Sequence, residues 1–431
     1  MLLAHGVGVR GDLPLPLWIV SYGAAAVLVI TFVGLVRGWK EPRLEDGGVG
    51  RPLPGWVQGA ATPVEWLLRI VGVAALAVVV VAGLTGPETG GSNFAPFMLY
   101  VIVWAGGMFV SGFVGNVWSA LDPVETVRKG LPVDEDAPDV RARLGLWPAA
   151  VLLLLFTWLE LAYFEPADPF AVTLMVVVLI AAPVLGGLWS SSWWLRGANA
   201  FGALFRLLAT MAPFHRDDEG VLRVRAPLSG LPRLNPIPGT VALILVALGS
   251  TTFDGFTRTT IWESVAAGKT GWTGTAIATL GLLVITGIVA AMYLGAMADA
   301  AKGTEHSTGD LARAFAHTLI PIALGYAVAH YFSLLVFEGQ QAIKLASDPF
   351  DLGWDLFGTA DWTRSFSAVS AATIAWVQAG AIVLGHVAAV VLAHDRAIAL
   401  FPQRKATESQ IALMIVMVVY TMGGLGLLLG A

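Results

Sequence analysis

The chain contains no cysteine among its 431 residues. This absence excludes disulfides, cysteine-ligated zinc, iron–sulfur clusters and a thiolate nucleophile. Charge is also scarce, because Asp, Glu, Lys and Arg make up 13% of the residues, whereas 56% are hydrophobic and the mean hydropathy is +0.74. A soluble domain of this composition has too little charge to cover its surface. The composition therefore predicts a polytopic membrane protein, and the net charge of −5 argues against nucleic acid as a partner.

Familiar catalytic signatures are missing as well. The chain has no phosphate-binding glycine loop, no His-Glu-x-x-His and no Gly-x-Ser-x-Gly. The residues that bear on function are therefore the ionisable side chains inside apolar segments. Burying such a side chain in a bilayer costs free energy, so it usually has a polar partner or a functional role.

Long apolar stretches are abundant, and a spanning helix needs about 20 such residues. The sequence predicts an all-α polytopic transmembrane helix bundle of about ten spans, in a single membrane domain over residues 1–431. Its halves would be 1–190 and 237–431, joined by a cytoplasmic segment, 191–236. The amphipathic stretch 196–214 predicts one interfacial helix. The ten stretches are 15–36, 64–84, 94–118, 148–164, 169–188, 238–252, 272–297, 311–337, 369–394 and 411–429.

Lysine and arginine predict the orientation, because they accumulate on the cytoplasmic side of membrane proteins. With ten spans, twenty of the 25 basic residues fall on one side. We therefore expect a multi-pass protein of the bacterial inner membrane with both termini outside. The other five, on the outer side, are Arg10, Arg258, Lys269, Lys344 and Arg364.

Four histidines fall in or beside two consecutive apolar stretches: His317, His330, His386 and His394. On straight helices, the first two are about 20 Å apart and the last two about 12 Å apart, so neither pair chelates one metal within its own helix. An antiparallel arrangement of the two helices places His330 and His386 within about 8 Å in depth, in the outer half of the membrane. His317 and His394 then lie near the inner face, and Pro321 is expected to kink the first helix.

Carboxylates complete both groups. Glu160, Asp254 and Glu338 belong to the outer side and form a candidate polar site with His330 and His386. These are ligand types that suit a divalent metal, with His330 and His386 as its ligands, and they also suit a proton relay. The inner polar group consists of His317, His394, Asp299 and Asp395.

A haem b held by pairs of histidines is a second cofactor that the sequence leaves open. Membrane cytochromes of this kind space the two histidines of one helix by about thirteen or fourteen residues. His317 and His330 fit that spacing, whereas His386 and His394, eight residues apart, do not. The cofactor therefore stays unknown at this point.

Six short segments of the chain carry a resemblance to known proteins. They are Leu3-Ala4-His5-Gly6, Asp12-Leu13-Pro14-Leu15-Pro16, Ala329-His330-Tyr331-Phe332-Ser333-Leu334-Leu335, Glu338-Gly339-Gln340, Gly385-His386 and Ala393-His394-Asp395-Arg396. With these segments the chain resembles a family of bacterial polytopic membrane proteins often labelled fenitrothion hydrolase. The resemblance implies cleavage of an organophosphate ester, a reaction that commonly uses a metal-activated hydroxide. It would then make His330 and His386 the metal ligands, with Asp254 or Glu338 as ligand or base.

Three classes of function remain open on the sequence alone. A transporter or ion- or metal-handling protein is the first, because many spans, interior polar residues and no soluble domain are typical of one. A membrane-embedded metal-dependent hydrolase is the second. The third is a redox or assembly subunit with partner subunits in a membrane complex. Membrane lipid is a partner in all three.

Overall fold

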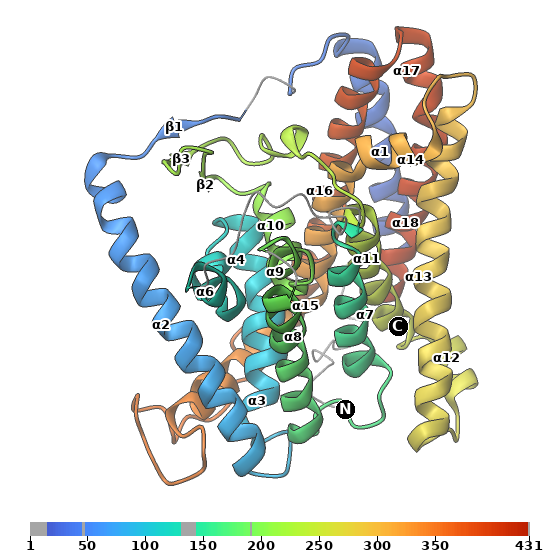
Figure 1. The fold of residues 1–431 in the computed structure, drawn as a ribbon. Helices are drawn as coiled ribbons and strands as arrows, with labels where there is room; N and C mark the ends of the chain where they lie inside the picture. Colours follow the sequence, from blue (N-terminus) through green and yellow to red (C-terminus); the bar gives the residue numbers. More distant parts are fainter. Residues whose placement is uncertain (1–14, 45–47, 131–143, 190–191, 430–431) are drawn as a thin grey trace.

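Long apolar helices make up most of the chain in a computed structural model, which describes residues 15–44, 48–130, 144–189 and 192–429 (Figure 1). The first half contains α1 (Leu17–Gly38), α2 (Gly55–Thr85), α3 (Phe94–Pro96), the π-helix η1 (Phe97–Gly106), α4 (Gly107–Phe113), α5 (Trp118–Leu121), α6 (Pro123–Gly130), α7 (Trp147–Leu161) and α8 (Pro169–Trp189). Then follow α9 (Ser192–Gly197), α10 (Ala200–Ala209), η3 (Leu231–Arg233), α11 (Thr240–Phe256), α12 (Thr260–Ala266), α13 (Gly271–Ala301), α14 (Thr308–Ala314), α15 (Ala316–Ser347), α16 (Ala371–Leu400), α17 (Gln403–Ser409) and α18 (Ile411–Leu429).

The all-α polytopic fold predicted from composition is confirmed, since each of the ten apolar stretches is largely helical. Within the described residues, eight helices are long and apolar enough to span a bilayer. The two others are α7, with 15 residues, and α11, which meets α12 at a bend of 85°. The exact number of spans therefore stays a prediction.

Two predicted elements need correction. The stretch 311–337 is not one helix: α14 has its own capping box at Ser307, and α15 begins after Phe315 and continues to Ser347. The expected interfacial helix, 196–214, consists of α9, α10 and the start of a strand. Almost every residue of α10 is buried, so this helix lies inside the protein rather than along a surface.

A small antiparallel sheet, which the sequence did not predict, ties two distant connections together. Its strands are β1 (Arg51–Pro52), β2 (Phe214–Arg216) and β3 (Leu222–Val224), in the order β1-β3-β2. Val224 pairs with Arg51 on one side and Phe214 on the other. The sheet therefore holds the α1–α2 connection against the segment between α10 and α11.

The centre of the bundle is α15. In its most apolar window, 72% of the residues are buried, against 17% for α1 and α13. Pro321 lies inside α15, which is nevertheless one continuous helix. Its closest neighbour is α16, and the two backbones meet at Gly325 and Gly385, where a side chain at either position would strike a carbonyl oxygen of the other helix at 2.6 Å. Small residues of this kind let membrane helices approach closely.

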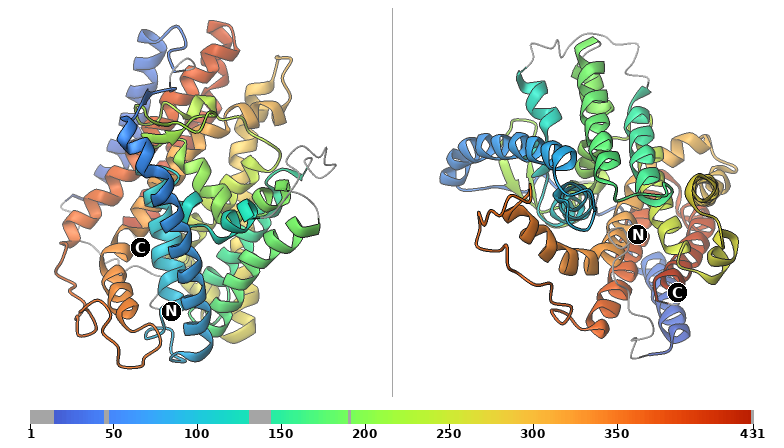
Figure 2. Two further views of the ribbon diagram at one scale, coloured as in Figure 1. Left: turned by 60° about the vertical axis from the view of Figure 1, so that its left-hand side comes forward. Right: turned by 90° about the horizontal axis from the view of Figure 1, so that it is seen from below.

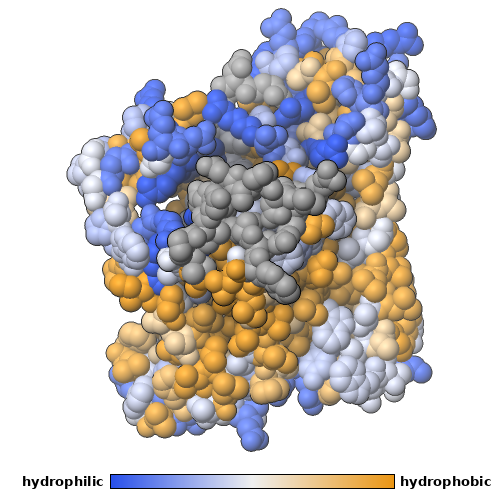
Figure 3. All heavy atoms as spheres, in the orientation of Figure 1, coloured by the Kyte–Doolittle hydropathy of each residue, from blue (hydrophilic) through white to orange (hydrophobic). Residues whose placement is uncertain are grey.

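The remaining helices surround this centre. Seen from below, α2 and α8 lie together on one side of the bundle, away from α1, α13 and α18 (Figure 2). Hydrophobic residues cover the lower part of the face drawn in Figure 3, and hydrophilic residues gather over the strands at its upper left. An apolar belt with a polar end is the pattern that a bilayer selects.

Candidate functional site

A histidine–aspartate pair lies between α15 and α11 in the interior of the bundle. His330 Nε2 forms a hydrogen bond with Asp254 Oδ2, and the two side chains are 1% and 0% exposed. Asp254 lies in the last turns of α11, and His330 lies near the middle of α15. Burial of both groups is tolerated because each provides the other with a polar partner.

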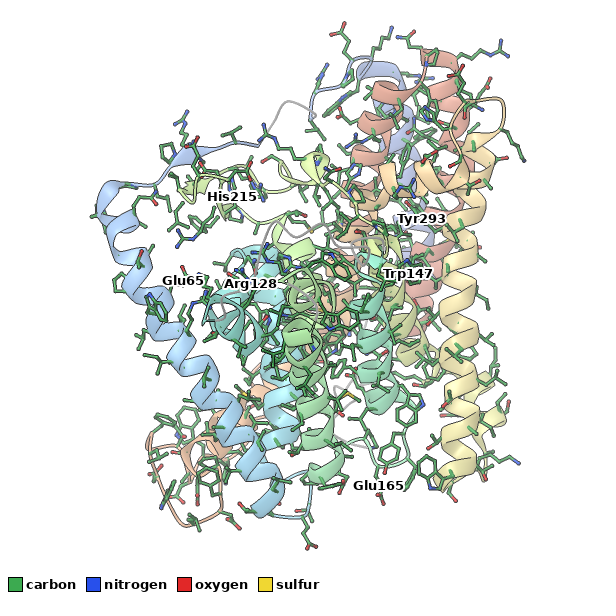
Figure 4. The ribbon with its side chains drawn as sticks, viewed as in Figure 1. Glu65, Arg128, Trp147, Glu165, His215 and Tyr293 are labelled. Atoms are coloured by element: carbon green, nitrogen blue, oxygen red, sulfur yellow. The ribbon has the colours of Figure 1, made fainter. Side chains whose placement is uncertain are left out.

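Glu160 brings a second carboxylate to this pair. It belongs to the last turn of α7, which packs against α11, and the residue is 3% exposed. Its charge interacts with that of Asp254, and its Oε2 has no hydrogen-bond partner among the described residues. In Figure 4, Trp147 marks the beginning of α7, and Glu165 marks the loop that follows it at the lower end. Its burial places Glu160 in the interior of the bundle.

Aromatic side chains of η1 form the next wall of this site. Trp104 Nε1 donates a hydrogen bond to the Tyr331 hydroxyl at 2.9 Å, and the Tyr100 hydroxyl donates to the Pro166 carbonyl at 2.7 Å. The charge of Glu160 acts on both tyrosines. A π-helix is uncommon, and short π segments in helices frequently lie at functional sites. Here η1 presents two hydroxyl- or indole-bearing rings to the buried acids.

Arg258 lies in the turn between α11 and α12, two residues beyond the end of the helix that carries Asp254. Its charge acts on Tyr331, and its Nε and Nη2 atoms are buried without a hydrogen-bond partner in the described part of the chain. We define Glu160, Asp254 and His330 as the acid–histidine cluster. The arrangement joins two carboxylates and an imidazole from three helices, with a guanidinium close by, and such groups exchange protons or bind cations.

Four residues of this neighbourhood were missed by the sequence analysis: Tyr100, Trp104, Tyr331 and Arg258. The aromatic residues carry no separate signal among the 43 aromatic side chains of the chain, 16 Trp, 7 Tyr and 20 Phe. Arg258 did carry a signal, since it is a charged residue only four positions after Asp254 in the sequence.

Glu338, another predicted member of the outer site, has a partner of its own. Its Oε1 accepts a hydrogen bond from Arg364 Nη1 at 2.6 Å, and the arginine side chain is 26% exposed. Glu338 and His330 are eight residues apart on α15, which corresponds to about 12 Å along the axis. The described contacts of Glu338 therefore belong to the end of the bundle rather than to the acid–histidine cluster.

His386 occupies apolar surroundings. Its Nδ1 pairs with the Ile382 carbonyl at 2.8 Å, one turn earlier in α16, and its ring lies 5.9 Å from that of Tyr420. Nε2 is buried without a hydrogen-bond partner among the described residues, beside a cavity of about 30 Å³ that Met417 and Tyr293 also line. A cavity of that size has room for one or two waters at most.

The relation between His330 and His386 follows from the contact of Gly325 with Gly385. His330 lies five residues beyond Gly325, and His386 lies one residue beyond Gly385 on an antiparallel helix. The two histidines are therefore separated by about 9 Å in depth. No hydrogen bond or ring contact joins them among the described residues. A metal bridging them stays a prediction.

The inner polar group divides into two kinds of contact. Asp395 Oδ1 accepts hydrogen bonds from Trp39 Nε1 at 3.0 Å and from the Arg43 amide at 2.7 Å, and His394 Nε2 pairs with the Trp39 carbonyl at 2.9 Å. These contacts attach the chain that follows α1 to α16. His317 pairs with the Ala314 carbonyl at 3.1 Å. Asp299 forms an exposed ion pair with Lys302.

A metal site needs several ligand side chains close together. Within residues 15–44, 48–130, 144–189 and 192–429, no three His, Asp or Glu side chains gather closely enough to hold a metal ion. The predicted ligands His330 and His386, and the haem that the histidine spacing left open, therefore have no contact that supports them in the described part of the chain.

Comparisons with known proteins add no family. No protein-family model, no curated protein and no solved structure matches the chain. The resemblance to proteins labelled fenitrothion hydrolase therefore stays an expectation. Its first segment, Leu3-Ala4-His5-Gly6, and most of its second, Asp12-Leu13-Pro14, lie outside the described residues.

Proposed function

We propose that the protein is a transporter or ion-handling protein of the membrane, and that the acid–histidine cluster takes up and releases a proton. The architecture is that of a polytopic helix bundle. The observation that supports the proposal is Glu160, a buried acid whose Oε2 lacks a described hydrogen-bond partner and whose charge acts on Asp254. Ionisable groups facing a bundle interior mark ion pathways and proton relays.

The chemistry follows from two buried carboxylates, those of Glu160 and Asp254, whose charges act on each other. In a medium of low dielectric two such anions repel, so a proton on one of them stabilises the pair. An imidazole ring can both accept and donate a proton, so His330, which is hydrogen-bonded to Asp254, can pass a proton on. The three side chains come from α7, α11 and α15, so a shift of one helix changes their spacing and thereby their hold on the ion.

The direction of the bundle in the membrane is part of the proposal. We propose that the chain is a multi-pass protein of the bacterial inner membrane and that its basic end faces the cytoplasm. The acid–histidine cluster then lies in the outer half of the membrane. A proton would reach the cluster from outside past Arg258. The positive charge of Arg258 attracts anions and slows the approach of cations.

The test is ion movement in liposomes that contain the purified protein and a pH-sensitive dye. Gradients of H⁺, Na⁺, K⁺, Mn²⁺ and Zn²⁺ are imposed in turn. We expect at least one protein-dependent flux, and we expect His330→Gln to reduce it by at least about tenfold, as loss of a proton-transferring group commonly does. His317→Gln is the matched control, because His317 pairs with the Ala314 carbonyl at the end of α14 rather than with a member of the acid–histidine cluster, and we expect a change of less than twofold.

Two results contradict the proposal. One is the absence of any flux above that of protein-free liposomes. The other is an equal flux through native protein and the His330→Gln variant, with both shown to be monodisperse and equally stable to heat.

The metal-dependent hydrolase and the redox or assembly subunit stay predictions of the sequence, because no contact among the described residues favours either. A metal analysis and a visible spectrum of the same purified protein test them directly. Stoichiometric metal that is lost in His386→Ala indicates the hydrolase, and a Soret band indicates a haem subunit.

A further inference from the structure

Two cavities of opposite character meet on the side of the bundle formed by α2. The first is polar, has a volume of about 830 Å³, and lies among α2, α6, α9, α10 and the strand β2. The second is apolar, has a volume of about 470 Å³, and lies among α2, η1, α4 and α8. Neither takes part in the acid–histidine cluster. Both cavities lie along the same stretch of α2.

Basic residues outnumber acidic ones in the polar cavity. Six cationic side chains line it against four carboxylates, those of Glu65, Asp122, Glu125 and Asp218. Glu65 and Glu125 are each shared by three cations. The pairs are Glu65 with Arg69 (2.6 Å), Lys129 (2.5 Å) and Arg216 (3.3 Å), and Glu125 with Arg128 (2.7 Å), Arg196 (3.8 Å) and Arg206 (4.0 Å).

The six cations outnumber the four carboxylates even when the other two, Asp122 and Asp218, are ionised. Burial raises the pKa of Asp122 to about 6, against hydrogen bonds from Asn199 Nδ2 and the Val124 amide that stabilise the ionised form. Asp218 is exposed. Figure 4 places Glu65 on α2 and Arg128 on α6 at the same level, below His215 of β2. The cavity therefore has an excess of positive charge that suits an anionic group.

Trp118 of α5 lines both cavities, so they adjoin at this side chain. Here α2 and α5 touch, since a side chain at Gly72 would overlap the Leu121 carbonyl oxygen at 1.8 Å. Arg69, in the polar cavity, precedes Gly72, in the apolar one, by a single turn of α2. Two buried polar atoms, Trp118 Nε1 and Ser111 Oγ, have no hydrogen-bond partner among the described residues. They provide donors beside the junction.

We propose that the two cavities bind one anionic phospholipid of the membrane, with its phosphate in the polar cavity and an acyl chain in the apolar cavity. The order of the two cavities matches such a molecule. The polar cavity with its cations comes first, then the hydrogen-bond donors at the level of the ester groups, and then the apolar cavity along α2 and η1. Figure 3 shows hydrophilic residues at the upper left above the hydrophobic belt, which is where a headgroup lies.

The apolar cavity distinguishes a lipid from a free phosphate. A phosphate ion needs only the cationic compartment, whereas the side chains of Val79, Ile102 and Leu179 contribute nothing to binding it. A lipid needs both compartments, and basic pockets between transmembrane helices are known to bind lipid headgroups. Blocking the apolar cavity alone therefore separates the two ligands.

The test uses the full chain, purified in detergent and stripped of lipid. Thermal stabilisation is titrated with phosphatidylglycerol, with phosphatidylcholine and with inorganic phosphate. In one variant Lys129→Gln and Arg216→Gln remove two half-exposed cations, and in another Ile102→Trp fills the apolar cavity. Lys302→Gln with Arg404→Gln, and Val29→Trp, are matched controls on exposed positions that line neither cavity.

We expect phosphatidylglycerol to bind the native protein more tightly than phosphatidylcholine. Loss of two basic residues near a lipid headgroup should weaken its binding by about tenfold or more. Ile102→Trp should weaken it similarly, and both controls should bind as the native protein does. Equal binding by all variants overturns the proposal. Stabilisation by inorganic phosphate that Ile102→Trp leaves unchanged, without a preference for phosphatidylglycerol, overturns it in favour of a free anion.

Discussion

Glu160 and Asp122 are both deeply buried acids, and their surroundings give them different roles. Asp122 accepts hydrogen bonds from Asn199 and from the Val124 amide, so both of its oxygens are used in fixing the turn between α5 and α6. Glu160 has an oxygen without a described partner beside a second carboxylate. A buried acid with satisfied oxygens stabilises structure, and one that lacks a partner is available to a ligand or a proton.

Asp122 makes a prediction about pH. Its folded-state pKa, about 6, exceeds the ordinary 3.8, so the folded protein binds this proton more tightly than the unfolded chain does. The contribution of Asp122 to the free energy of unfolding therefore falls as the pH rises from about 4 to about 6 and stays low above that. The two-unit difference corresponds to about 3 kcal/mol at most.

Asp122→Asn removes this dependence. The variant loses one hydrogen bond at every pH, because two amide groups then face each other at Asn199. Relative to the native protein, we expect its melting temperature in detergent to improve by a few degrees between pH 5 and pH 8. A difference between the two proteins that is constant with pH would contradict the assignment to Asp122.

At the scale of residues, the sequence predicted a part of the site. Glu160, Asp254 and His330 stood out because an ionisable residue in an apolar stretch is conspicuous. The sequence did not distinguish His330 from His386, since both are histidines within long helices. What separates them is lateral position: α11 brings Asp254 to His330, whereas His386 meets the carbonyl of its own helix.

Among the helices, the contact of α15 with α16 governs the depth of every histidine. It rests on two glycines, Gly325 and Gly385, whose missing side chains let each backbone touch the other. The separation that we derive, about 9 Å between His330 and His386, agrees with the antiparallel register predicted from sequence.

Substitution of either glycine tests this contact. Gly325→Ala and Gly385→Ala each place a methyl group about 2.6 Å from a carbonyl oxygen of the other helix, so we expect a loss of about 1–3 kcal/mol of stability. Gly339→Ala on α15 and Gly380→Ala on α16 are matched controls with open space around them, and helix propensity should stabilise them slightly. Melting curves in detergent compare the four. Equal behaviour of all four variants would refute close contact at Gly325 and Gly385.

Periodicity and apolar length predicted the long helices but not their local exceptions. The stretch 94–118 looked like one ordinary span, and the structure gives it a π-helix, η1, followed by α4 and a turn. The amphipathic stretch 196–214 looked interfacial, and α10 is buried because α4 and α7 cover it. Neither outcome follows from local sequence, since each depends on which neighbours arrive from elsewhere in the chain.

For the molecule as a whole, η1 separates the two candidate sites. Trp104 and Tyr100 face the acid–histidine cluster, whereas Ile102 and Val103 of the same helix line the apolar cavity beside α2. A lipid in that cavity would therefore touch the helix that supports Glu160 and Tyr331. The two proposals remain separable, since the lipid test measures binding and the ion test measures flux.

The orientation of the bundle in the membrane can be tested by labelling introduced cysteines. The absence of cysteine makes single-cysteine variants unambiguous. Glu305→Cys lies in the exposed connection between α13 and α14, and Ser367→Cys lies in the exposed connection between α15 and α16. In intact bacterial cells, a membrane-impermeant maleimide should label Ser367→Cys at once and Glu305→Cys only after permeabilisation. The reverse pattern would place the basic end outside.

The proposed function rests on proton exchange by buried Glu160 together with Asp254 and His330. Its most direct test is ion flux in liposomes, compared between Glu160→Gln and Glu338→Gln. Both substitutions remove one buried carboxylate from the same predicted side, but Glu338 already has Arg364 as its partner. We predict that Glu160→Gln abolishes the protein-dependent flux, whereas Glu338→Gln retains at least half of it. A flux that survives in Glu160→Gln would contradict it.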